Sequence, residues 1–325
     1  MRELRIGLLG AGAHSVQNHG PAWRDYVARH PGTVDLVAVC DLDGGKARDY
    51  ADRFGFSETH TDLEGILGEG LDGLVAITPM DVTETVAGRI LEAGIPVVIE
   101  KPPGVGVAGT RRLLDVAERT QTPHMISFNR RFTPALEKAR AWMAEGGRQP
   151  RHVISRILRH NRLEPDFARD TGLHQVDAVL SIIGAPSRVC GHQEFPEGAR
   201  AANYTARIET DAGVTASIVQ TPDVGVAEES IEILGDDFRV WLDFQDGAVH
   251  IDAAGKRVLS WSAAEEDMEL HEANGAYGET AAFVAGLQAG GVLTPTMADG
   301  LVTMQAIVAL QEGTTWESAN GEQGR

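Results

Sequence analysis

The chain has 325 residues, enough for two domains of ordinary size, and its composition, with 42% hydrophobic and 23% charged residues, is that of a soluble globular enzyme. The formal net charge is −18 and is spread along the chain, so we do not expect nucleic acid or anionic membranes as partners. No apolar stretch approaches the roughly 20 residues that a membrane-spanning helix needs, and two isolated cysteines form neither a disulfide framework nor a zinc site.

In the first part of the chain, short apolar runs alternate with helical patterns. Runs that are apolar at successive residues are typical of parallel strands buried on both faces. Their alternation with helices predicts right-handed crossovers and a doubly wound, Rossmann-type α/β sheet. The predicted strands cover residues 4–9, 34–40, 71–77, 95–99 and 124–128, and the predicted helices between them include 44–54, 82–93 and 107–119.

The pattern changes between residues 123 and 150. Strand-like runs then follow one another with few helices, and several alternate apolar and polar residues, as a sheet with one buried face requires. We therefore expect a dinucleotide-binding domain over residues 1–123 and an α+β domain over 124–325, with an open, predominantly antiparallel sheet. In this second part the predicted strands are 151–158, 202–209, 214–220, 230–234 and 238–244, and the predicted helices are 134–144, 174–183, 279–288 and 298–311.

A glycine pair directly follows the first predicted strand. Gly10 permits a tight turn, and Gly12 lets the backbone approach a pyrophosphate, with Ala13 and His14 next in the same turn. The third position of the usual dinucleotide motif, normally glycine, is Ser15 here, or it is displaced by a slightly longer loop before Pro21. Taken alone, this pattern is as often a plain strand–helix turn as a nucleotide site.

The second predicted strand ends in Asp41, where an acidic side chain accepts hydrogen bonds from the adenosine ribose. A carboxylate there repels a 2′-phosphate, so NAD is favoured over NADP. Asp41 could also cap the following helix, and the two roles are compatible. Thr78 and Pro79 end a later strand at the same carboxyl edge of the sheet, where ligands bind in open α/β folds, although Pro79 alone could be an ordinary turn residue.

The strand over residues 95–99 ends in Glu100-Lys101-Pro102. Charges at the end of a buried strand cost free energy unless they are paired or used. Lys101 could donate a hydrogen bond to a developing alkoxide beside a bound nicotinamide. The alternative is a structural ion pair between Glu100 and Lys101, and position alone does not decide between the two.

Together these features resemble the glucose–fructose oxidoreductase / inositol dehydrogenase (Gfo/Idh/MocA) family over nearly the whole chain. Glu-Lys-Pro combined with a downstream Asp-x-Gly-x-His is the specific part of the pattern. The matching segments, in chain order, are Gly10 to Gly12, Asp41, residues 51–55, Thr78-Pro79, residues 100–102, residues 128–132, residues 170–177, and the closing helices with Tyr277, Glu279, Phe283 and residues 298–301.

The resemblance implies roles for individual residues. Glu100 and Lys101 match cofactor contacts, and Lys101 also matches the lysine that touches the reacting oxygen. His174 matches the histidine expected to act as acid/base, and Asp170 the aspartate that binds and orients substrate. A histidine near its ordinary pKa can take the hydroxyl proton as hydride leaves the carbon. Without the resemblance, His174 would more often be a core residue at the start of an apolar helix.

Two further segments resemble substrate contacts of the family. Arg131 lies in the loop after the last strand of the first domain, and Asn161 in the basic segment Arg159-His160-Asn161-Arg162. Either segment could instead be solvated surface. The family needs no metal, and the histidines near the amino terminus lack the spacing of metal ligands, so no metal is expected.

The resemblance implies reversible, NAD-dependent oxidation of a secondary alcohol on a sugar, sugar derivative or cyclitol. Two alternatives stay open: NAD-dependent glycoside hydrolysis, and a dinucleotide-binding sensor without catalysis. In the family the second domain binds substrate and packs against a partner, so a homodimer or homotetramer is expected. The amino terminus enters a strand without a leader segment, so we expect a cytoplasmic protein.

Overall fold

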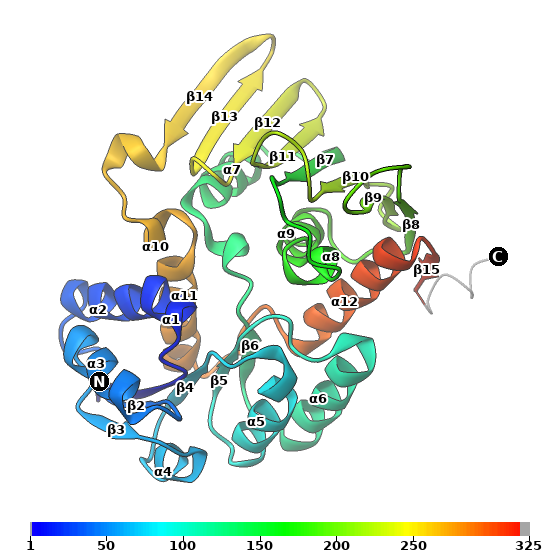
Figure 1. Cartoon of the computed structure of the whole chain (residues 1–325). Coiled ribbons are helices and arrows are strands. Elements are labelled where there is room, and N and C mark those ends of the chain that lie inside the picture. The colour runs from blue at the N-terminus through cyan, green and yellow to red at the C-terminus, as the bar shows by residue number, and fades with distance from the viewer. Residues whose placement is uncertain (1, 319–325) are drawn as a thin grey trace. The chain divides into compact units, whose positions relative to one another are not determined.

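The computed structural model describes residues 2–318, which divide into two units (Figure 1). Among the described residues, the first unit combines Arg2–Asn129 with Leu270–Leu301, and the second combines Arg130–Glu269 with Val302–Ser318. Among the described residues, no helix is both long enough and apolar enough to cross a membrane. The boundary expected near residue 123 differs from this division, because the last parallel strand and a later helical segment belong to the first unit.

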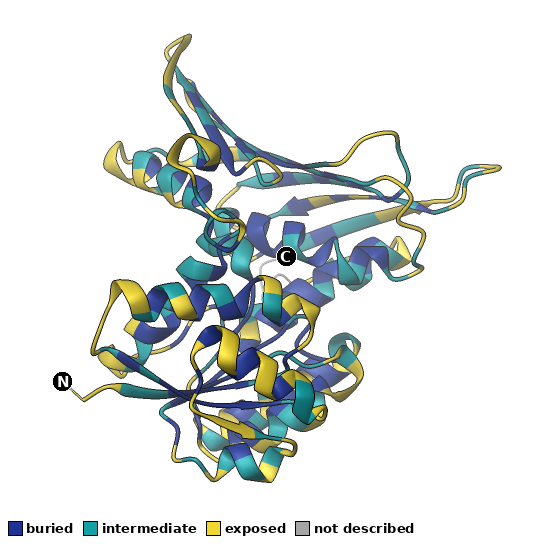
Figure 2. Cartoon of the chain, turned by 60° about the vertical axis from the view of Figure 1, so that its left-hand side comes forward, coloured by how far each residue is buried: buried dark blue, intermediate teal, exposed yellow. Residues whose placement is uncertain are grey.

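The first unit holds a six-stranded sheet in the order β3-β2-β1-β4-β5-β6, and every pair in it is parallel. Its central strands are buried along almost their whole length, as the dark blue arrows of Figure 2 show. This confirms the predicted Rossmann sheet. The strands are β1 (Leu4–Leu9), β2 (Val34–Cys40), β3 (Glu58–His60), β4 (Gly73–Ala76), β5 (Val97–Ile99) and β6 (His124–Ile126).

Local chemistry sets the ends of the connecting helices. In α3, for example, the Asp43 carboxylate accepts hydrogen bonds from the backbone N–H groups of Gly45 and Lys46, and Gly55 ends the helix with a φ of 88°. The helices of this part are α1 (Ala13–Gln17), α2 (His19–Arg29), α3 (Gly44–Phe54), α4 (Leu63–Leu67), α5 (Met80–Glu92) and α6 (Gly106–Thr120).

Two helices far along the chain, α10 (Leu270–Ala273) and α11 (Ala276–Ala289), complete the first unit. Helix α11 packs against α2, where the rings of Trp23 and Phe283 meet edge to face with centroids 6.4 Å apart. Ser127, just after β6, donates a hydrogen bond to the buried carboxylate of Glu279 on α11 at 2.9 Å. These long-range contacts explain why a boundary drawn from the local pattern does not reproduce the units.

The second unit holds a nine-stranded sheet in the order β14-β13-β12-β11-β7-β10-β9-β8-β15. Among the strand pairs that the structure describes, only that of β7 with β10 is parallel, so the predicted open, predominantly antiparallel sheet is confirmed. The strands are β7 (Pro150–Leu158), β8 (Arg188–Glu194), β9 (Asn203–Glu209), β10 (Thr215–Thr221), β11 (Glu228–Gly235), β12 (Phe238–Asp243), β13 (Ala248–Ala253), β14 (Lys256–Ser262) and β15 (Thr315–Glu317).

Two helices pack against this sheet. Helix α7 (Pro134–Glu145) packs against β12 and β13, and α9 (Leu173–Ile183) packs against β7 and β10. The short helix α8 (Phe167–Asp170) precedes α9, and the boundary between the units falls within α12 (Met297–Glu312). The Asp-x-Gly-x-His segment is therefore the junction of α8 and α9.

Candidate active site

The glycine turn after β1 requires its first glycine. Gly10 has a φ of 103°, and a Cβ there would lie 2.0 Å from the carbonyl oxygen of Ile77. Its N–H donates to the carbonyl of Cys40 at 2.8 Å, which ties the turn to β2. Any side chain at Gly10 would push apart two strand ends, so the close turn depends on glycine.

The second glycine has a different environment. Gly12 is exposed at the start of α1, with an ordinary φ of −74°, and a Cβ built on it would meet nothing within 4 Å. Ala13 and His14, which are also exposed, are the first two residues of α1. Open space beside this backbone fits the close approach of a cofactor pyrophosphate, which is the reason for glycine at this motif position.

Ser15 replaces the third glycine of the motif without loosening the fold. Its side chain is fully buried and its hydroxyl donates to the Tyr50 hydroxyl of α3 at 2.9 Å. Burial raises the pKa of Tyr50, and the hydrogen bond with Ser15 only partly offsets that effect. The serine that stands in place of glycine thus forms a specific contact between α1 and α3.

Asp41 lies at the end of β2, where its carboxylate holds the glycine turn. One oxygen accepts the backbone N–H of Ala11 at 2.8 Å, and the other accepts that of Asp43 at 2.9 Å. The neighbouring Leu42 is 90% exposed, and no arginine stands beside Asp41 in the sequence to hold a phosphate. The group therefore fits a ribose hydroxyl better than a 2′-phosphate.

Thr78 and Pro79 follow β4 at the same carboxyl edge. The Thr78 hydroxyl shares a hydrogen bond with that of Thr83 at 2.8 Å, and Pro79 is the residue before α5. Thr83 also donates to the carbonyl of Pro79 at 3.0 Å, so the loop is held by the first turn of α5. Pro79 is exposed, which agrees with the turn role considered for it.

Glu100 and Lys101 follow β5, at this edge too. The Glu100 side chain is only 10% exposed, and its Oε2 lies 3.8 Å from Nε2 of His14 and 3.7 Å from Nε2 of His19. Burial acts to raise the pKa of Glu100, but His19, His14 and Lys101 outweigh it and the net pKa is lowered. A carboxylate in this setting stays charged at neutral pH, next to the half-buried Lys101.

In the second unit, Asp170 ends α8 and His174 lies in the first turn of α9, both partly exposed. The Asp170 carboxylate accepts a hydrogen bond from Nε of Arg169 at 3.0 Å. Between them, a Cβ on Gly172 would lie 2.2 Å from the side-chain amide of Gln220, whose nitrogen donates to the Gly172 carbonyl at 3.1 Å. The glycine thus allows the α8–α9 turn to sit directly against the end of β10.

Arg131 holds α9 in place through Asp177, which follows His174 on that helix. Its guanidinium donates two hydrogen bonds, at 2.7 and 2.8 Å, to the fully buried carboxylate of Asp177. The Thr303 hydroxyl lies 3.4 Å from the same carboxylate. Asp177 is one helical turn after His174, so this pair positions the helix that carries the predicted acid/base residue.

Asn161 is exposed, with a φ of 56°, in the segment after β7. Its N–H donates to Asp223 at 3.1 Å, and its side-chain oxygen accepts from Arg200 at 3.2 Å. A cavity of about 380 Å³ adjoins this group and is lined in part by Arg200 and Asp223. The neighbouring Arg162 donates to the Thr171 hydroxyl at 3.1 Å, so the segment adjoins the α8–α9 turn within the second unit.

A carboxylate with two guanidinium partners lies at the end of β7. Glu229 is almost fully buried and pairs with Arg130 at 2.6 Å and with Arg159 at 2.6 Å. Burial acts to raise the pKa of Glu229, but the two arginines outweigh it and lower the pKa. Arg159, part of the basic segment read from the sequence, is therefore a structural partner of this carboxylate.

The structure gathers the predicted cofactor residues at one edge of the first sheet. The predicted substrate residues Arg131, Asn161, Asp170 and His174 all belong to the second unit, whereas Lys101 belongs to the first. Sequence reasoning missed His19 and Asp177 as neighbours of site residues. A polar residue inside the apolar patterns of α2 and α9 was the available signal for them.

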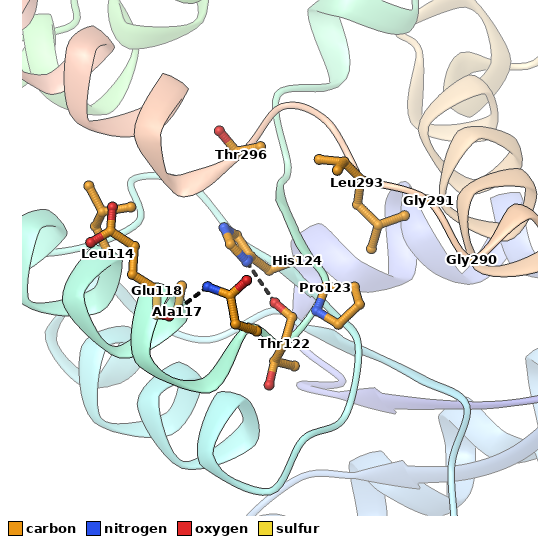
Figure 3. A pocket seen from close by; sticks show the side chains of 12 residues that line it. Leu114, Ala117, Glu118, Thr122, Pro123, His124, Gly290, Gly291, Leu293 and Thr296 are labelled. Carbon is orange, nitrogen blue, oxygen red and sulfur yellow. Dashed lines mark hydrogen bonds between the residues drawn. The ribbon is translucent and has the colours of Figure 1, made fainter.

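A separate cavity of about 410 Å³ lies at the opposite end of β6 (Figure 3). Its lining includes Leu114 of α6, His124 at the start of β6, and Leu293. Both ring nitrogens of His124 are engaged, by the carbonyl of Thr122 at 2.9 Å and the N–H of Met297 at 3.1 Å. Because the cofactor residues follow the carboxyl ends of the strands, this cavity is not the predicted site.

Comparison with known proteins identifies the first unit. A family model described as "Oxidoreductase family, NAD-binding Rossmann fold" (Gfo/Idh/MocA) matches residues 4–128. Residues 4–128 therefore belong to the NAD-binding Rossmann domain of the Gfo/Idh/MocA oxidoreductase family. The matched residues contain the glycine turn, Asp41 and Glu100-Lys101, so this family membership confirms the resemblance read from the sequence, and the family is one of NAD-dependent dehydrogenases.

Curated relatives are distant. D-apiose dehydrogenase from Paraburkholderia graminis is 24% identical over 296 residues, which cover 87% of this chain and 73% of the relative. An inositol 2-dehydrogenase from Corynebacterium glutamicum is 22% identical over 191 residues, covering 57% of this chain and 55% of the relative. The chain thus matches little more than half the length of that inositol dehydrogenase.

Solved structures share the fold over nearly the full length. An oxidoreductase domain protein from Kribbella flavida has a TM-score of 0.81 at 23% identity, covering 98% of this chain and 99% of that one. A levoglucosan dehydrogenase in complex with NADH and levoglucosan also has a TM-score of 0.81, at 18% identity, covering 98% and 100%. At these identities the likeness establishes the two-part fold and nothing finer.

Proposed function

We propose that this family member is an NAD-dependent dehydrogenase that oxidises a secondary alcohol of a sugar, sugar derivative or cyclitol. The observation that carries the proposal is the gathering of Gly12, Asp41 and Lys101 at the carboxyl edge of one parallel sheet, where open α/β folds bind ligands. The names of the relatives support the substrate class, since they include apiose, inositol and levoglucosan dehydrogenases.

The residues present fit NAD. The open space at Gly12 accepts the pyrophosphate, and Asp41 accepts hydrogen bonds from the adenosine ribose while its charge disfavours a 2′-phosphate. Thr78, Pro79, Glu100 and Lys101 would border the nicotinamide half. Bound NAD supplies the hydride acceptor, and the chain supplies orientation and proton transfer.

In the proposed mechanism, Lys101 donates a hydrogen bond to the reacting oxygen and stabilises negative charge there. His174 takes the hydroxyl proton as the alkoxide forms and returns it in the reverse direction. Asp170 accepts a hydrogen bond from a neighbouring hydroxyl and fixes which carbon is oxidised. Arg131 acts indirectly, because its bond with Asp177 holds the helix of His174.

An absorbance assay at the NADH band tests the function. Purified protein is incubated with NAD or NADP and a panel of sugars, sugar acids, sugar phosphates and inositols. We expect NADH formation with NAD and at least one polyol, and a weaker signal with NADP. NADH binding without turnover of any panel member would instead favour a dinucleotide-binding sensor.

We also propose a homodimer or homotetramer. Helices α7 and α9 pack on the nine-stranded sheet. Along β12, buried residues alternate with partly exposed ones, and the partly exposed Trp241 stacks on His250 of β13 with ring centroids 5.3 Å apart. Light scattering coupled to gel filtration measures the mass in solution. A mass equal to one 34.8 kDa chain would contradict this assembly.

A further inference from the structure

Two histidines and a buried carboxylate meet beside the glycine turn of the first unit. The Nε2 atoms of His14 and His19 lie 3.8 and 3.7 Å from the same atom, Oε2 of Glu100, and the three potential ligand atoms all lie within 4.8 Å of one another. Spacing along the sequence did not reveal this cluster, because Glu100 comes from the end of a strand far from the two histidines.

The Glu100 oxygen at the centre of this cluster is not satisfied by the protein. The side chain is nine-tenths buried, and within residues 2–318 its Oε2 accepts no hydrogen bond. Both imidazole nitrogens are too distant for one. A buried carboxylate oxygen left in this way costs free energy, so the gap between the oxygen and the two nitrogens is suited to a bound group.

We propose that His14, His19 and Glu100 form a binding site for a divalent transition-metal ion, best matched by Zn²⁺. Two imidazoles and one carboxylate are the ligand set of zinc sites that keep a fourth position open. With metal–ligand distances of about 2.0–2.2 Å, tetrahedral ligand atoms lie about 3.4 Å apart. The two separations from Glu100 have to close by a few tenths of an ångström, and the separation between the two imidazole nitrogens, which lies within 4.8 Å, by up to about 1.4 Å. The His14 side chain is half exposed, so it is the ligand whose ring is least enclosed by the fold.

A hydrogen-bond chain sets the proton position on His14 in the ion-free protein. The N–H of Ala276 donates to Oδ1 of Asn274 at 3.0 Å, and Nδ2 of Asn274 donates to Oδ1 of Asn18 at 2.6 Å. The Asn18 nitrogen therefore faces His14, 3.0 Å from its carbonyl oxygen and 3.2 Å from its Nδ1. Nδ1 accepts in this arrangement, so the ring proton is on Nε2.

Metal binding through Nε2 moves that proton to Nδ1. The Nδ1–H group and the N–H of the Asn18 amide, which are both donors, then face each other, and this contact lowers the affinity for the ion. An aspartate at residue 18 would keep an acceptor for Asn274 and add an acceptor for the Nδ1 proton, which is the carboxylate–histidine–metal arrangement. The sign of this effect distinguishes the proposed site from nonspecific binding. Asn18→Asp should raise the metal affinity by about 10- to 100-fold.

The test uses the full chain, stripped with a chelator and without cofactor. Co²⁺ is titrated while visible ligand-field absorption is followed, and Zn²⁺ affinity is measured by competition with a chromophoric chelator. We expect one ion per chain, an affinity loss of about 100-fold or more in His14→Ala, and no change in the matched control His192→Ala, an exposed histidine of the second unit.

Any of three results would overturn the proposal. The first is the absence of saturable Co²⁺ and Zn²⁺ binding in the wild-type chain at neutral pH. The second is equal affinity in the wild-type and His14→Ala chains, and the third is no gain in affinity in an Asn18→Asp chain whose folding is checked by circular dichroism. Since neither cofactor nor substrate is present, these results are independent of the dehydrogenase assay.

Discussion

The guanidinium of Arg131 and the carboxylate of Asp177 form a bidentate pair, with N–O distances of 2.8 and 2.7 Å and no exposure of the carboxylate. Such pairs are short, directional and hard to replace by lysine. Because Asp177 lies one turn after His174, the pair connects the stability of the second unit to the placement of the predicted acid/base residue.

Removing this guanidinium should therefore be costly. Arg131→Ala takes the bidentate guanidinium away from a buried carboxylate, and we expect a loss of about 3–5 kcal/mol in the free energy of unfolding, measured by urea denaturation. The double variant Arg131→Met, Asp177→Leu should recover a large part of that loss, since it removes both buried charges. Equal stability of Arg131→Ala and wild type would show that the pair contributes little.

The glycine turn allows a matched pair of substitutions. Gly12→Ala has an allowed φ and open space for its Cβ, so the free energy of unfolding should change by no more than about 0.5 kcal/mol. If a pyrophosphate occupies that space, NADH affinity, measured by fluorescence titration, should fall by about tenfold or more.

Gly10→Ala is the contrasting variant. Its Cβ would meet the Ile77 carbonyl at 2.0 Å, and its φ of 103° suits only glycine, so we expect a lower melting temperature in the absence of any cofactor. If a stable Gly12→Ala protein bound NADH with unchanged affinity, that result would contradict the placement of the pyrophosphate at this turn.

Asp41 should decide between NAD and NADP. A charge-assisted hydrogen bond is worth about 1.5–3 kcal/mol, so Asp41→Ser should weaken NADH binding by about 10- to 100-fold and reduce the repulsion of a 2′-phosphate. The measured quantity is the ratio of the dissociation constants for NADH and NADPH. The ratio should shift in favour of NADPH. An unchanged ratio would mean that Asp41 only accepts the hydrogen bonds from the N–H groups of Ala11 and Asp43 and does not select the cofactor.

Glu229 predicts a dependence of stability on pH. Its pKa is lowered in the folded protein, so its pairing stabilises the fold above the unfolded-state pKa of about 4.3, and this contribution is lost as pH falls through the lower folded-state value. Glu229→Gln should be less stable than wild type at pH 7, and the difference should shrink below about pH 4. A difference that is constant with pH would exclude this linkage.

Much of the fold was predictable because local patterns dominate it. The buried run at residues 34–40 and the helix at 44–54 have the predicted bounds, since continuous apolarity and the Asp43 cap act within a few residues. Short or polar strands were missed: β3 has only three residues, and β14 is mostly exposed. These strands form because a neighbouring strand offers hydrogen-bonding groups, which no local pattern reveals.

The site residues, too, divide into those that local sequence patterns predict and those that depend on tertiary contacts. Gly10, Asp41 and Lys101 follow strand ends, and parallel topology brings such residues to one edge. The pairing of Arg131 with Asp177 and the meeting of His14, His19 and Glu100 depend on tertiary packing, so the sequence carried no spacing signal for them. The expectation that the histidines lack metal-ligand spacing is true along the chain and does not describe their arrangement in space.

The most direct test of the proposed chemistry is the turnover of His174→Ala and Lys101→Met with the substrate found in the NADH screen. General acid–base catalysis contributes about 10²- to 10⁴-fold, so kcat should fall by that order in His174→Ala, while the folded protein still binds NADH; Lys101→Met should fall by a similar order and also still bind NADH. Wild-type turnover in both variants would contradict the assignment of Lys101 and His174 to the reaction.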